Sequence, residues 1–277
     1  MWNNIDGEYS TTHFAGLADE IGPDVREREA APVHQVVEHE RTAIIKQLDK
    51  VLCMFHFIDT RGVRAMMAAS GAVISGSAAL SILHPDRFII NDLDFFVTAK
   101  GYPTLLAFVL DHGYKVSIAD VPSVDYADTN IVLTLIHAAS RASINIVASM
   151  DSHVVGTITQ FHSTVVMNYI AFYGVVCLYP MWTMKNAGLV VVREAEKRGC
   201  IQKYRARGYT MAYKGSAMPN FDEGHCCGQD PTCPRTRRTL HDGHSLFVPF
   251  DNIPAHLPSA EATMVRWTLP APCDSVS

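Results

Sequence analysis

Charged residues are scarce in this chain, because only 18% of its 277 residues are Asp, Glu, Lys or Arg. Lys and Arg are absent from residues 1–25, which contain five acidic residues instead. A secretory signal and an organelle transit peptide both need basic residues there, so we expect an intracellular protein, in the cytoplasm or the nucleus. The net charge of -5 also argues against general adhesion to nucleic acid or to anionic membranes.

The sequence also lacks a regular glycine period and a heptad pattern, which excludes a collagen-like or coiled-coil chain. Hydrophobic residues make up 48% of the chain. This fraction and the chain length are sufficient for a buried core, so the protein as a whole is not disordered.

One long uncharged run raises the question of a membrane span. Residues 163–184 contain no charged side chain and have the length of a transmembrane helix. Asn168 and Pro180 interrupt the run, and its halves fit a buried helix over Ser163–Phe172 and a buried strand over Val175–Leu178. We therefore expect no membrane partner.

The composition divides the chain into four segments. Residues 1–31 carry seven acidic and two basic residues and resemble a flexible arm. Residues 32–160 alternate predicted helices and strands and form the candidate core, and residues 161–215 are a predicted helical extension with a basic stretch. Residues 216–277 are rich in Cys, His and Pro and show little periodicity. The expected fold class is α+β, a mixed β-sheet with flanking helices and a C-terminal Cys/His-rich extension.

Secondary structure is predicted from the spacing of apolar residues, which recur at helical intervals in helices and alternate or run together in strands. The predicted helices cover about residues 37–55, 61–69, 78–83, 103–113 and 184–198. The predicted strands cover about residues 72–75, 88–97, 114–118, 130–137 and 143–149.

Two acidic residues interrupt one predicted strand. Asp92 and Asp94 are two positions apart, so their side chains leave the same face about 6.6 Å apart along the backbone. Leu93 and Phe95 beside them are apolar, and two unpaired acids in such a strand are costly to bury. A hard divalent cation such as Mg²⁺ compensates for them, and the alternative is a strand end exposed to solvent.

Gly76 and Ser77 connect a short apolar strand to a predicted helix. A strand that ends in Gly-Ser and opens a helix presents backbone N–H groups, a hydroxyl and the helix N-terminus to an anion. The sequence therefore predicts a phosphate-binding turn at these two residues.

The combination of VISGSAAL with NDLDFFV resembles the signature of the polymerase-β-like nucleotidyltransferase superfamily, over about residues 60–150. The resemblance implies a nucleotidyltransferase-like mixed sheet with a nucleoside triphosphate at Gly76 and Ser77. It also implies Mg²⁺ held by Asp92 and Asp94, and transfer of a nucleotidyl group to an acceptor by in-line attack.

Members of this superfamily have a third carboxylate on a later strand, where it helps to hold a second metal and accepts the proton of the attacking hydroxyl. The corresponding strand here reads ASINIVAS, and its central residue is Asn145. An amide oxygen can coordinate a metal, but it brings no charge and cannot act as a base. The residues that can replace the base are Asp120, Asp125, Asp128 and Asp151.

Three interpretations of the core therefore stay open. The first is a nucleotidyltransferase with an unknown acceptor. The second is a nucleotide-binding or regulatory protein that has lost transfer activity, and the third is a purely structural scaffold.

The stretches FHSTVVMNYIAFYGVVCLYPMWTMKNAGLV and CPRTRRTLHDGHSL resemble parts of uncharacterised fungal proteins with a nucleotidyltransferase-like core, which implies no known activity. In the first stretch, His162, Asn168 and Lys185 are candidates to line the cleft. The alternative for each is a structural hydrogen bond or a solvated charge. Lys185 is the best of the three for binding a triphosphate.

Soft metal ligands gather near the C-terminal end. The motif HCCGQDPTCP contains His225, Cys226, Cys227 and Cys233, and His241 and His244 follow. Such a cluster predicts a structural zinc site. Adjacent cysteines do not match the usual Cys-x₂-Cys spacing, so free thiols packed under a loop are the alternative, and a disulfide is disfavoured inside a cell.

Residues 193–214 carry seven basic and two acidic residues. Such a stretch is more often a solvated helix face than a binding surface. Next to a triphosphate it can instead bind phosphates or an RNA backbone, with Tyr204 and Tyr209 stacking on bases. The acidic total of the chain makes RNA the less favoured interpretation.

Overall fold

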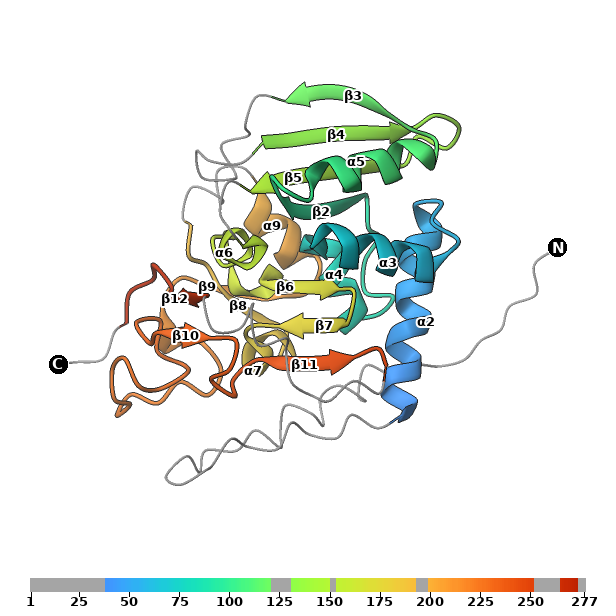
Figure 1. Ribbon diagram of the computed structural model, residues 1–277. Coiled ribbons are helices and arrows are strands. Elements are labelled where there is room, and N and C mark those ends of the chain that lie inside the picture. Colours follow the sequence, from blue (N-terminus) through green and yellow to red (C-terminus); the bar gives the residue numbers. More distant parts are fainter. Residues whose placement is uncertain (1–37, 121–130, 150–152, 193–198, 252–264, 274–277) are drawn as a thin grey trace.

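The computed structural model of the chain describes residues 38–120, 131–149, 153–192, 199–251 and 265–273. These residues form an α+β structure around one eight-stranded sheet (Figure 1). In sheet order the strands are β11 (Leu246–Pro249), β7 (Gly174–Cys177), β6 (Asn168–Ala171), β1 (Val73–Ser75), β2 (Asp92–Thr98), β5 (Ser143–Ser149), β4 (Ile131–His137) and β3 (Tyr114–Asp120).

The sheet is mixed. All neighbouring strands run antiparallel except β2 and β5, which are parallel. Its strands come from residues 32–160, 161–215 and 216–277 alike, so three of the four segments separated by composition share one sheet.

Four helices pack their apolar residues with one face of the sheet: α2 (Glu38–Met54), α3 (Thr60–Ser70), α4 (Gly76–Leu83) and α5 (Tyr102–Asp111) (Figure 1). Helix α2 buries Ile44, Leu48 and Leu52, which recur at helical spacing. Helix α3 ends at Gly71, which adopts a left-handed conformation with φ +68°. Helix α4 ends directly before His84-Pro85, where the ring of a proline prevents continuation.

The second hydrophobic cluster contains residues of the opposite face of the sheet, such as Phe96 and Val147. Helices α6 (Val154–Ile158) and α7 (Pro180–Thr183) contribute to this cluster. The C-terminal part of the chain adds Trp267 from the two-stranded ribbon of β10 (Arg238–Thr239) and β12 (Arg266–Trp267).

A third, smaller hydrophobic cluster joins α4 to the segment that follows the hairpin of β6 and β7. That segment contains the parallel pair β8 (Ala187–Leu189) and β9 (Thr210–Ala212), with α9 (Cys200–Ala206) between them in sequence. Leu80 of α4 packs in this cluster with Ile201 and Tyr204 of α9.

The structure confirms the elements predicted between residues 38 and 149. The predicted strand over residues 88–97 begins later, at Asp92, and the others agree within a few residues. The strand predicted over Val175–Leu178 is confirmed as β7.

One predicted helix is wrong, and a second is wrong over the part that the structure describes. Residues Ser163–Phe172 form a 3-10 turn, η1 (Thr164–Val166), followed by strand β6, whose four residues are all buried. A strand buried on both faces is continuously apolar, and periodicity cannot distinguish it from a buried helix. The helix predicted over residues 184–198 does not form over residues 184–192, which contain β8, and residues 193–198 lie outside the described part.

In the described part of residues 161–215 the helices are therefore short. Strand β11 was missed by the sequence analysis. The predicted acidic arm, residues 1–31, lies outside the described residues. Among the helices that the structure describes, none has both the length and the apolar character needed to cross a membrane.

Candidate functional site

Three polar residues lie side by side on neighbouring strands of the sheet. Asp94 of β2 is in register with Asn145 of β5, which is in register with Thr134 of β4. Asn145 Nδ2 donates a hydrogen bond to Asp94 Oδ1 at 2.8 Å, and Thr134 Oγ1 donates to Asn145 Oδ1 at 2.9 Å. Both ends of the Asn145 amide are therefore hydrogen-bonded.

The Gly-Ser turn lies against the same aspartate. Gly76 is the first residue of α4 and has φ +68°. A Cβ atom at this position would lie 2.9 Å from Asp94 Oδ2, which is closer than real contacts allow. The preceding residue, Ser75, is the register partner of Asp94 in β2. Glycine is therefore required here both for its conformation and for the close approach to the carboxylate.

Ser77 is the second residue of α4, and only 3% of it is exposed. The first backbone N–H groups of a helix have no partner within the helix. A phosphate at this turn would therefore meet backbone N–H groups more readily than the Ser77 hydroxyl.

The acidic pair has an unusual electrostatic environment. Burial and the neighbouring charge of Asp92 raise the pKa of Asp94 to about 7, although the hydrogen bond from Asn145 and the positive charge of Lys203 act in the opposite direction. The carboxyl group of Asp94 therefore changes its charge near neutral pH. A perturbed pKa of this kind is typical of functional sites.

Lys203 is the residue that the sequence analysis did not single out. It lies on α9, and its positive charge opposes the rise in the pKa of Asp94. Burial, assisted by the charge of Lys203, lowers the pKa of His162 to about 4. The rings of His162 and Tyr204 lie 5.6 Å apart between centroids. The only signal in the sequence was membership of the basic stretch. We call Asp92, Asp94, Asn145, Gly76 and Lys203 the acidic site.

The other cleft candidates have structural contacts. Asn168 is buried, and its Nδ2 donates a hydrogen bond to the Val165 carbonyl at 2.8 Å. The backbone carbonyl of Asn168 accepts a hydrogen bond from Ser75 Oγ at 2.5 Å. These contacts confirm the structural alternative for Asn168. Lys185 donates to Asn220 Oδ1 at 3.2 Å, so its contact with a triphosphate stays a prediction.

The alternative bases are not placed at the acidic site by any described contact. Asp120 ends β3, and β4 and β5 separate that strand from β2. Asp125, Asp128 and Asp151 lie outside the described residues.

Tyr204 and Tyr209, the candidates for stacking on RNA bases in the less favoured interpretation, are both buried, and RNA binding stays a prediction. Their exposed fractions are 4% and 3%, because both rings pack in the third hydrophobic cluster. Arg207, from the same basic stretch, places its guanidinium 4.0 Å from the ring centroid of Phe88. Part of the basic stretch thus stabilises the fold.

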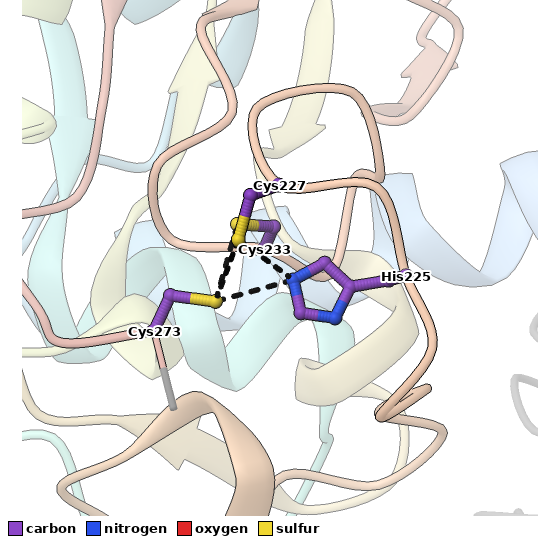
Figure 2. Close-up of side chains that lie close together, drawn as sticks. All are labelled: His225, Cys227, Cys233 and Cys273. Atoms are coloured by element: carbon purple, nitrogen blue, oxygen red, sulfur yellow. Dashed lines mark hydrogen bonds between the residues drawn. The ribbon is translucent and has the colours of Figure 1, made fainter. Parts of the chain in front are cut away.

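The Cys/His-rich region contains a compact group of metal-ligand residues (Figure 2). One ligand atom from each of His225, Cys227, Cys233 and Cys273 lies within 4.8 Å of the others. This group, the Cys/His cluster, can hold a metal ion. Three of the predicted zinc ligands are thus brought together.

The fourth predicted zinc ligand is wrong. Cys226 is exposed and lies outside the cluster, as do His241 and His244. Cys273 takes its place, although it is 40 residues from Cys233 and no spacing rule connects the two. Adjacent residues of an irregular loop point in different directions, so the sequence could not distinguish Cys226 from Cys227.

No protein-family model matches this sequence, and no curated protein matches it at a significant level. Inferences about function therefore come from the geometry of the acidic site and of the Cys/His cluster.

Proposed function

We propose that the protein binds a nucleoside triphosphate together with Mg²⁺ at the acidic site, and that it does not transfer a nucleotidyl group. The observation that supports the binding most directly is the close approach of the Asp94 carboxylate to the Gly76 turn, where a Cβ atom at Gly76 would lie 2.9 Å from Asp94 Oδ2. A turn suited to phosphate thus lies beside a carboxylate suited to a cation.

The donor set of the acidic site fits Mg²⁺. Asp92 and Asp94 offer hard oxygen atoms, and Mg²⁺ is commonly bound by one or two carboxylates together with phosphate oxygens. The raised pKa of Asp94 indicates that the protein alone does not compensate two charges at this place. Mg²⁺, when bound, would neutralise the charge of the carboxylates and of the phosphates.

The residues around the acidic pair are suited to an anionic ligand. The N-terminus of α4 has the polarity that attracts phosphate, and Gly76 removes the side chain that would block the approach. Lys203 adds a positive charge from α9. We infer that Lys203, rather than Lys185, is the first lysine to contact the phosphates.

The state of Asn145 favours binding over catalysis. Its amide is hydrogen-bonded to Asp94 and to Thr134, and an amide cannot accept the proton of an attacking hydroxyl. In the part of the chain that the structure describes, no other carboxylate occupies this place on β5. A ligand would therefore be held without a base to activate an acceptor.

Calorimetric titration with a non-hydrolysable ATP or GTP analogue, with and without Mg²⁺, tests the proposal. We expect binding that requires Mg²⁺ and is lost in Asp94→Asn, whose side chain keeps its size but loses the charge. The matched control is Asp111→Asn, the same change at an exposed carboxylate at the end of α5. Absence of nucleotide binding, or equal binding by both variants, would refute the proposal.

A further inference from the structure

Four of the six separations between ligand atoms of the Cys/His cluster are close to those of a tetrahedral zinc site. His225 Nε2 lies 3.1 Å from Cys273 Sγ and 3.6 Å from Cys227 Sγ, and Cys273 Sγ lies 3.5 Å from the sulfur atoms of both Cys227 and Cys233. Zinc bond lengths of about 2.3 Å to sulfur and about 2.0 Å to nitrogen give tetrahedral edges of roughly 3.8 and 3.5 Å. These four separations agree with the edges within a few tenths of an ångström, and all the ligand atoms lie within 4.8 Å of one another.

The same separations do not fit a disulfide. A disulfide bond is about 2.05 Å long, and it joins two sulfur atoms. Here three sulfur atoms and one ring nitrogen converge, and none of the three cysteines forms a disulfide (Figure 2).

The histidine is fixed in the tautomer that a metal needs. Its Nδ1 lies 2.5 Å from the backbone carbonyl oxygen of Asp222. A carbonyl oxygen only accepts hydrogen bonds, so Nδ1 carries the proton and Nε2 is left with its lone pair. That lone pair is directed at the sulfur atoms (Figure 2). Histidine ligands in metal sites commonly have such a hydrogen bond from the second ring nitrogen.

Two backbone N–H groups of the surrounding loop, those of Gly228 and Arg235, hydrogen-bond to Cys233. Gly228 directly follows Cys227 and has φ +81°, which allows the loop to turn back towards Cys233.

We propose that His225, Cys227, Cys233 and Cys273 bind one Zn²⁺ ion as a structural site. Three thiolates and an imidazole are ligands that zinc prefers, and four protein ligands complete its tetrahedral shell. No position remains open for a substrate, so the ion has a structural and not a catalytic role.

The function of this ion is to fasten residues 265–273 to the loop over residues 225–233. Residues 265–273 have few backbone bonds of their own: β10 and β12 pair over two residues each, and Leu269 N donates to the Pro234 carbonyl at 3.0 Å. An isolated two-stranded ribbon is marginally stable in water. A metal bond at Cys273 holds the segment at its end, and keeps Trp267 in the second hydrophobic cluster.

The metal content of the full-length protein, purified without added metal or chelator, tests the proposal. We expect one equivalent of zinc per chain by atomic emission. Replacement by Co²⁺ is expected to give the visible absorption of a tetrahedral site and a thiolate-to-cobalt charge-transfer band in the near ultraviolet. Protein that contains no zinc and takes up neither ion would overturn the proposal.

Two neighbouring cysteines provide matched variants. Cys227→Ser and Cys226→Ser both change an exposed residue of the same loop, so neither disturbs a packed core. We expect Cys227→Ser to lose the zinc and the charge-transfer band, and Cys226→Ser to keep both. Equal retention by the two variants would contradict the proposal.

The role of Cys273 is tested by protease cleavage. We expect a chelator, or Cys273→Ser, to accelerate cleavage between residues 233 and 273 at least tenfold, and added Zn²⁺ to reverse the effect of the chelator. Retention of one zinc by folded Cys273→Ser would overturn the assignment of this ligand. A cleavage rate that does not change on zinc removal would overturn the fastening role.

Discussion

Asn145 donates a hydrogen bond from Nδ2 to Oδ1 of Asp94, 2.8 Å away, across the parallel strands β2 and β5. The amide supplies a donor to a carboxyl group that burial already makes difficult to ionise. This hydrogen bond stabilises the free protein, and the amide itself cannot act as a base.

Asn145→Asp is expected to make the stability of the protein depend on Mg²⁺. The change replaces a hydrogen-bond donor by a like charge, so without the cation the free energy of unfolding should fall by about 1 to 3 kcal/mol at pH 8. Saturating Mg²⁺ should restore it. Urea unfolding with and without Mg²⁺ measures both effects, and Asn220→Asp, at an exposed position, is the control.

The same variant also tests the absence of transfer activity. Nucleotidyl transfer by Asn145→Asp, where the parent chain has none, would identify a degenerate enzyme. Transfer by the unchanged chain would contradict the binding-only proposal. A stability that does not respond to Mg²⁺ would argue against a cation at this site.

Asp94→Asn is expected to stabilise the cation-free protein at neutral pH. The folded pKa of Asp94, about 7, is above its ordinary value of 3.8, so the folded state holds a proton that the unfolded chain has released. The stability that this bound proton gives to the folded state is fully present below about pH 4 and is lost as the pH rises through about 7. At pH 8 we expect the free energy of unfolding of the variant to be about 1 to 3 kcal/mol higher than that of the parent. This difference should shrink towards pH 5. Urea unfolding across this pH range measures the difference, and a pH-independent difference would contradict the raised pKa.

Gly76→Ala is expected to be more damaging than Gly71→Ala. Both glycines have φ +68°, so both substitutions place an alanine in the left-handed conformation at the same conformational cost. A Cβ atom at Gly71 meets nothing within 4 Å, whereas one at Gly76 lies 2.9 Å from Asp94 Oδ2. We expect Gly71→Ala to lose about 1 kcal/mol of stability and Gly76→Ala to lose 1 to 2 kcal/mol more. Only Gly76→Ala should also lose nucleotide binding, measured by calorimetry. Equal losses of stability and binding in the two variants would contradict the close approach of Asp94 Oδ2 to Gly76.

Lys203→Gln is expected to raise the pKa values of Asp94 and His162 together. The positive charge of Lys203 lowers the pKa of both groups, so its removal changes both in the same direction. Titration by nuclear magnetic resonance, with labelled carboxyl and imidazole carbons, measures the two values. Lys100→Gln, at an exposed lysine, should change neither. A change in the pKa of only one of the two groups would show that the charge of Lys203 does not act on both.

The strand-turn-helix over residues 73–83 was predicted correctly because its signals are local. A short apolar run, Gly76 and the proline after His84 act on their own neighbours in sequence. The same holds for the register of Asp92 and Asp94 on one face of β2. Period-2 alternation is a property of any strand, and it needs no tertiary contact.

Lys203 and Cys273 could not be predicted because tertiary packing alone brings them to their sites. Lys203 reaches the acidic site through α9, which the third hydrophobic cluster holds against α4. Cys273 reaches Cys233 across 40 residues of sequence. The helix predicted over Ser163–Phe172 failed for a different reason, because a fully buried strand has no polar face to reveal its period.

Strand β11 has a consequence for the order in which the protein folds during synthesis. It pairs with β7 at the edge of the sheet, and its residues, Leu246–Pro249, are made long after the rest of the sheet. Until they leave the ribosome, the backbone of β7 is an open edge that other chains can pair with. We therefore expect nascent chains that stall before residue 246 to aggregate more readily than the full chain.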